Sequence, residues 1–77
     1  MSENANVEFI LEDRAIVIAR RSLDDHINVV LALLVYNACK YVVWLEDTNL
    51  EPTIYFNGRY YLSHEFKSAI ANYFNRK

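Results

Sequence analysis

The chain has 77 residues, of which 53% are apolar and 14% are aromatic, and its formal net charge at pH 7 is −2. A chain of this length forms one domain. The composition excludes a disordered polypeptide, which would be rich in charge and poor in aromatic residues. The small net charge excludes strong steering of nucleic acid by the molecule as a whole, although it allows a local basic patch. We expect residues 1–5 to be a disordered N-terminus and residues 6–77 to form one domain.

A β-hairpin is predicted at the start of the domain. Val7–Glu12 and Ala15–Arg20 are rich in β-branched or aromatic residues and are separated by the dipeptide Asp-Arg. A two-residue turn pairs Leu11 with Ile16 and Phe9 with Ile18. Because Asp-Arg is not a favoured two-residue turn, a longer turn with another register stays open.

The most apolar part of the sequence is Ile27–Tyr36, in which one residue in ten is polar. Ser22 precedes it and starts a Ser-Leu-Asp-Asp sequence, which is typical of a helix N-terminus because the hydroxyl accepts a backbone hydrogen bond and the acids suit the helix dipole. We therefore predict a helix from Leu23 to Cys39 or Lys40. A helix that is apolar all round must be covered on several sides, either by the sheet of this domain or by a second chain.

Shorter patterns predict three further strands. Tyr41–Glu46 has the residue types of a strand, and a polar, acidic loop follows it. Thr53–Phe56 and Arg59–Leu62 flank Asn57-Gly58, which is the strongest short-range hairpin signal because both residues accept positive φ.

A closing helix completes the predicted fold. Ser63 is its N-cap, the helix runs from His64 to about Asn75, and one face of it carries Phe66, Ile70, Tyr73 and Phe74. The element order is then β-β-α-β-β-β-α. This order predicts an α+β two-layer sandwich, in which both helices pack on one face of a mostly antiparallel sheet.

No catalytic residue, cofactor or metal site is predicted, so we expect a protein that is not an enzyme. The single cysteine, Cys39, lies too far along the predicted helix from His26 for the two to act together, and neither they nor His64 have metal-ligand spacing. Gly58 is the only glycine, so there is no glycine-rich phosphate loop. One cysteine, no signal-peptide pattern and an apolar run too short for a bilayer predict a cytoplasmic protein with no membrane partner.

The leading functional hypothesis is binding to another protein. A small acidic domain without catalytic residues has the character of an inhibitor or adaptor of a larger complex, such as a phage or mobile-element accessory protein that blocks a host or defence factor. The excess apolar surface of the predicted first helix also predicts a homodimer. The predicted partner-binding set combines aromatic residues, which are typical of interfaces, with acidic residues in turns, which could imitate phosphates if they converge. The set consists of Glu12, Asp13, Trp44, Glu46, Asp47, Glu51, Tyr55 and Tyr60.

The alternative hypothesis is a nucleic-acid-binding module. Basic residues gather in the last third of the chain, beside tyrosines of the predicted Asn-Gly hairpin. Aromatic side chains on a strand can stack on bases while a nearby basic helix holds phosphates. The residues predicted for this function are Arg59, Tyr61, Lys67, Arg76 and Lys77.

Overall fold

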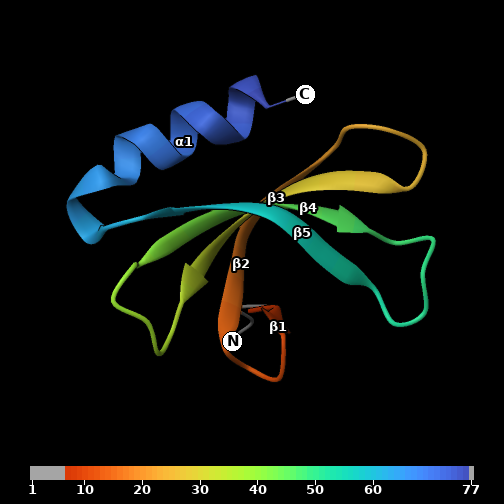
Figure 1. The fold of residues 1–77 in the computed structure, drawn as a ribbon, viewed down its shortest axis with the longest axis horizontal. Helices are drawn as coiled ribbons and strands as arrows, with labels where there is room; N and C mark the ends of the chain where they lie inside the picture. Colours follow the sequence, from red (N-terminus) through yellow and green to blue (C-terminus); the bar gives the residue numbers. More distant parts are fainter. Residues whose placement is uncertain (1–6, 77) are drawn as a thin grey trace, which may run out of the picture.

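Five antiparallel strands, arranged in their order along the chain, form one curled sheet that resembles half of a barrel (Figure 1). The computed structural model describes residues 7–76, so the disorder predicted for residues 1–5 lies outside the described part. The strands are β1 Phe9–Ile10, β2 Ala15–Ser22, β3 Ile27–Leu34, β4 Tyr41–Asp47 and β5 Ile54–Tyr61. A short 3-10 helix, η1 Ser63–Glu65, leads into helix α1 Phe66–Asn75. Of the helices formed by residues 7–76, none has the length and apolar character needed to cross a membrane.

The predicted α+β sandwich with two helices is wrong, because the segment predicted as the first helix contains the central strand β3. Val29, Val30 and Ala32 have no exposed surface, since β3 is covered on both faces. Such a strand is a continuous apolar run, which periodicity alone does not distinguish from a buried helix. The element order is therefore β-β-β-β-β-α. The predicted homodimer depends on an all-apolar helix, and this segment is a strand instead.

The residues predicted to start that helix form the turn between β2 and β3. Ser22 donates a hydrogen bond from its hydroxyl to the carbonyl of Asp24, at 3.2 Å. The backbone N–H groups of Leu23 and Asp24 both donate to the carbonyl of Ile27, at 2.8 and 3.0 Å. Serine and aspartate serve turns as well as helix starts, because their side chains bond to nearby backbone in both. The same residues therefore fit either structure.

The predicted N-terminal hairpin is present, but its two-residue turn is wrong. Phe9 pairs with Ile16 and Ile10 with Ala15, so four residues connect β1 to β2. Three consecutive residues of this turn, Leu11, Glu12 and Asp13, have positive φ angles of 53°, 56° and 67°. The turn is therefore the longer alternative, which agrees with the low preference of Asp-Arg for two-residue turns.

The strand predicted over Tyr41–Glu46 is confirmed as β4, but the Asn-Gly hairpin after it is wrong. Both predicted arms belong to one strand, β5, and Asn57-Gly58 forms a bulge opposite Trp44. Asn57 has the positive φ of 54° that the motif favours, whereas Gly58 does not have positive φ. Glycine is needed at position 58 for space, because a Cβ atom there would lie 2.6 Å from Nε1 of Trp44.

We expect Gly58→Ala to destabilise the protein by about 1–3 kcal/mol, because the added methyl group must displace a buried indole. Urea unfolding followed by circular dichroism would measure the change. Asn57→Gly is the matched control in the same bulge, and we expect it to stay within about 0.5 kcal/mol because glycine adopts positive φ without strain. Equal stability of Gly58→Ala and the parent chain would contradict the close Trp44 contact.

The closing helix is confirmed, although its cap and its buried face differ from the prediction. The buried residues of α1 are Ala69 and Tyr73, which pack with Val29, Leu31 and Val43 on one face of the sheet. Phe74, predicted on the buried face, is 67% exposed. The N-cap residue of η1 is Leu62 and not Ser63. The backbone N–H of Leu62 instead donates to Oε1 of Glu65, at 2.8 Å.

Two arginines connect the end of α1 to the sheet through hydrogen bonds. Arg21, on β2, donates to the carbonyl of Tyr73 at 2.9 Å and to that of Arg76 at 2.6 Å, where the helix leaves its last carbonyls unsatisfied. Arg76 in turn donates to the carbonyl of Val43, at 2.8 Å, beside the bulge between β4 and β5, and to the carbonyl of Asn57 within it. Arg21 therefore bonds carbonyls at the end of α1, and Arg76 bonds carbonyls at the bulge.

Candidate functional site

The face of the sheet opposite α1, which we call the inner face, encloses its own apolar residues. Val30, Ala32 and Val42 lie on it and are fully buried, although no described helix covers them. The sheet is curled (Figure 1). The side chains of Leu34 and Trp44 pack with these residues on the inner face. Polar side chains occupy the end of the inner face near the β2–β3 turn, and a pocket occupies the opposite end, near the β3–β4 loop.

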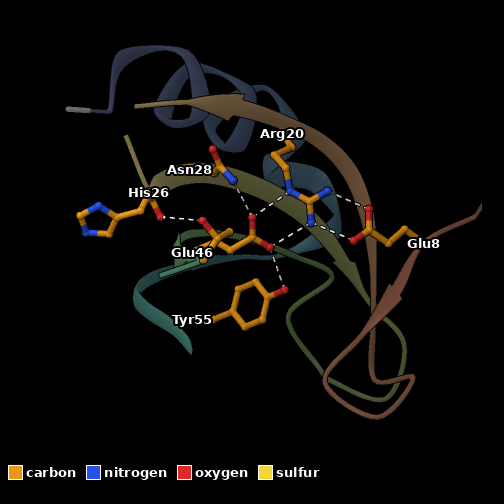
Figure 2. Close-up of polar contacts among 7 residues, drawn as sticks. Glu8, Arg20, His26, Asn28, Glu46 and Tyr55 are labelled. Atoms are coloured by element: carbon orange, nitrogen blue, oxygen red, sulfur yellow. Dashed lines mark hydrogen bonds and ion pairs between the residues drawn. The ribbon is translucent and has the colours of Figure 1, made fainter. Parts of the chain in front are cut away.

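The polar end is a row of five side chains that crosses the whole sheet, one from each strand or its flank (Figure 2). This polar row consists of Glu8, just before β1, Arg20 of β2, Asn28 of β3, Glu46 of β4 and Tyr55 of β5. Arg20 donates two hydrogen bonds to each carboxylate, at 2.9 and 2.9 Å to Glu46 and at 2.8 and 2.9 Å to Glu8. Asn28 and Tyr55 donate to Glu46 at 2.9 and 2.8 Å.

Glu46 is the centre of the polar row and is 3% exposed. Each of its oxygens accepts two hydrogen bonds, so all four lone-pair sites of the carboxylate are used. Burial raises the pKa of Glu46, but the hydrogen bonds from Arg20, Asn28 and Tyr55 outweigh it and hold the pKa below its ordinary value. Glu46 therefore has no free lone pair with which to bind a ligand.

The polar row predicts a stability plateau between about pH 5 and pH 10. The hydrogen bonds from Arg20 lower the pKa of Glu8, and the pKa of Glu46 is also lowered, so their contribution is present above the unfolded pKa and is lost as pH falls through the folded values. Burial and the bond to Glu46 raise the pKa of Tyr55 to about 12. Its contribution is present below the unfolded pKa of about 10 and is lost as pH rises through the folded value.

Urea unfolding across the pH range would measure this profile, with Tyr55→Phe as the matched variant. Phenylalanine keeps the ring and removes the hydroxyl, so we expect the alkaline fall attributable to Tyr55 to disappear while the acid fall remains. An alkaline fall that is unchanged in Tyr55→Phe would show that another group causes it.

The other end of the inner face is hollowed into a pocket of about 250 Å³. Ala15, Leu34 and Trp44 are its buried lining. Its remaining lining residues come from the β1–β2 turn, the β3–β4 loop and β5, and are Leu11, Arg14, Tyr36, Asn37 and Tyr60. Tyr36 is 84% exposed and Tyr60 is 52% exposed. The rings of Trp44 and Tyr60 meet edge to face, with centroids 6.4 Å apart.

The structure brings some of the predicted partner-binding aromatics together. Trp44 and Tyr60 both line the pocket, whereas Tyr55 packs against the other side of Trp44, at 5.5 Å between ring centroids, and belongs to the polar row. Trp44 is 6% exposed, so it forms the buried base of the pocket. Of these three aromatic residues, only Tyr60 is exposed.

The predicted partner-binding acids do not converge. Glu12 and Asp13 are exposed in the β1–β2 turn, at the pocket end of the sheet. Asp47 and Glu51 lie at the end of β4 and in the loop after it, at the polar end, and Glu46 is buried. The arrangement therefore gives no support to phosphate imitation by a joint acidic surface.

The residues predicted for nucleic-acid binding are also divided. Arg76 is bonded to sheet carbonyls, and burial lowers its pKa. Tyr61 packs against the core beneath α1, while Arg59 and Lys67 are exposed. Lys77 lies outside the described residues. Of the predicted cations within the described residues, only Arg59 and Lys67 are therefore exposed.

The predicted sites do not include Glu8, Arg20 and Asn28 of the polar row, nor Arg14, Tyr36 and Asn37 of the pocket. Asn28 carried a usable signal, because a polar residue within an apolar run needs a buried partner. Tyr36 and Asn37 carry no such signal, since the sequence pattern predicts a helix over their segment. The residues of the pocket come from distant parts of the chain, and only the register of the strands brings them together.

Comparisons of this chain with protein-family models, with curated proteins and with solved structures give no match.

Proposed function

We propose that this chain is a non-catalytic binding protein that recognises another protein through the pocket of the inner face. The observation that carries the proposal is the exposure of Tyr36 and Tyr60 beside the buried Trp44. A domain of this size has little apolar surface to spare, so tyrosines left in solvent around a cavity favour a role in contact. Tyrosine and tryptophan are also enriched among residues that dominate binding energy.

The size of the pocket supports a protein partner over a cofactor. Sites for drug-sized molecules and cofactors have volumes of about 300–1,000 Å³ and bury most of the ligand. The pocket of about 250 Å³ is smaller and suits one anchoring side chain. Interfaces commonly centre on such an anchor in a pocket, with the surrounding contacts excluding water.

The test is a selection of random peptides on the immobilised full chain, from libraries displayed through either end of the peptide. Trp44 is the only tryptophan, so its fluorescence reports binding at the pocket directly. We expect Tyr36→Ala and Tyr60→Ala each to weaken the selected peptides about tenfold or more, since each removes an aromatic contact.

Phe74→Ala is the matched control, because Phe74 is an exposed aromatic residue on α1, which packs on the opposite face of the sheet. We expect it to leave the affinity unchanged. Peptides that depend on Phe74, or a selection without any tyrosine-dependent peptide, would overturn the proposal. Binding of an oligonucleotide that is lost on replacing Arg59 and Lys67 would instead favour the nucleic-acid function.

A further inference from the structure

Two polar side chains of the pocket, those of Arg14 and Asn37, are held in place by backbone contacts and keep N–H donors free. Arg14 donates from Nε to the carbonyl of Leu11, at 3.0 Å, and its Nη groups make no hydrogen bond within residues 7–76. The side-chain carbonyl of Asn37 accepts from the backbone N–H of Cys39, at 3.0 Å, which leaves the amide Nδ2. Both side chains are thus fixed by backbone contacts, with N–H groups to spare.

This donor set selects the polar group of a ligand. A carboxylate has only acceptors, and charge-assisted hydrogen bonds from an arginine to it are stronger than neutral ones. Arg14 is the one charged residue that lines the pocket in the described part of the chain. Apart from Arg14 and Asn37, the lining residues are apolar or aromatic, as at Leu34 and Trp44. The matching ligand carries an apolar group directly beside a carboxylate.

The sheet edge beside the pocket is unsuited to a passing strand. Leu62, just after β5, has its N–H bonded to the side chain of Glu65 and its carbonyl bonded to the backbone N–H of the same residue, at 2.8 and 2.9 Å. Farther along β5, the Asn57-Gly58 bulge breaks the regular pairing. Bulges and occupied backbone groups of this kind protect edges from strand addition. A partner strand would therefore form few backbone hydrogen bonds by running along this edge past the pocket in both directions.

We propose, resting on the proposed function, that the pocket captures the C-terminal residue of its partner protein. The apolar side chain of that residue enters the pocket and contacts Trp44 and Leu34, and its α-carboxylate accepts hydrogen bonds from Arg14 and Asn37. A chain end needs only one exit from the pocket, which agrees with the protected edge. Capture of a terminal carboxylate is a recurring mode of peptide recognition.

The test compares acetylated tetrapeptides of sequence Gly-Gly-Gly-X, with X as Leu, Val or Phe, in free-acid and C-terminally amidated forms. The control is an amidated Gly-Gly-Leu-Asp peptide, whose carboxylate belongs to the Asp side chain and not to the C-terminus (an internal acid). Titrations use the full chain, with Trp44 fluorescence and NMR shifts as readouts. We expect at least one free acid to bind about tenfold more tightly than its amide.

Arg14→Gln should remove this preference, whereas Arg59→Gln, which replaces an exposed arginine that does not line the pocket, should keep it. Equal binding of acid and amide, preference for the internal acid, or no binding by any free acid would overturn the inference. Selected peptides that bind through Tyr36 and Tyr60 without a free C-terminus would overturn it while leaving the proposed function in place. If neither tetrapeptides nor selected peptides bind at the pocket, both proposals fail.

Discussion

Replacing Glu46 with alanine is expected to lower the free energy of unfolding by about 3 kcal/mol, at the lower end of the range for breaking a buried ion pair. Three donors lose their acceptor at once: Arg20, Asn28 and Tyr55. The effect stays at the lower end because Arg20 is partly exposed and keeps its bonds to Glu8. Urea unfolding at neutral pH would measure the change.

Glu8→Ala is the matched control, because Glu8 pairs with the same guanidinium. The side chain of Glu8 is 50% exposed, whereas that of Glu46 is 4% exposed. Exposed ion pairs contribute about 0–1 kcal/mol, so we expect a loss within that range. Similar losses for the two variants would show that burial of Glu46 does not set its contribution.

Leu34→Ala is expected to destabilise the protein by about 2–5 kcal/mol, which is the cost of losing a buried leucine side chain and leaving a cavity. Leu34 is 7% exposed and packs with Val30, Val42 and Trp44 on the inner face. Because it also lines the pocket, the new space opens toward solvent, which favours the lower half of the range. Thermal unfolding together with urea titration would measure the loss.

Leu50→Ala serves as the control, since Leu50 is an exposed leucine in the loop between β4 and β5. Surface substitutions usually change stability by less than about 0.5 kcal/mol. A small effect at Leu34, comparable with that at Leu50, would contradict the enclosure of the inner face by the curled sheet.

The sequence predicts elements well where local pattern and tertiary environment agree. The Tyr41–Glu46 strand and the closing helix have strong local signals, and both are present. It fails at β3 and β5, where the environment decides. β3 is apolar on both faces because the sheet is covered on both, and this erases the alternation that identifies most strands. At β5, the close approach of Trp44 to Gly58 turns a hairpin motif into a bulge.

The candidate site was harder to predict than the fold. Trp44 and Tyr60 are predicted as aromatic residues on neighbouring strands, and the pocket contains both. Glu46 is predicted as a turn acid, but the register of β3 against β4 places it opposite Asn28 in the buried polar row. Arg14 and Tyr36 join the pocket only because the turn after β1 and the loop after β3 meet at one end of the sheet.

The most direct test of the proposed binding site is a two-dimensional ¹H–¹⁵N NMR titration of the full chain with a selected peptide. The indole N–H of the single tryptophan gives one resolved signal from the floor of the pocket. Our account predicts shifts at this signal and at the backbone of Arg14, Tyr36, Asn37 and Tyr60, with α1 unaffected. Shifts confined to α1 or to the β2–β3 turn would contradict it and place the binding surface elsewhere on the molecule.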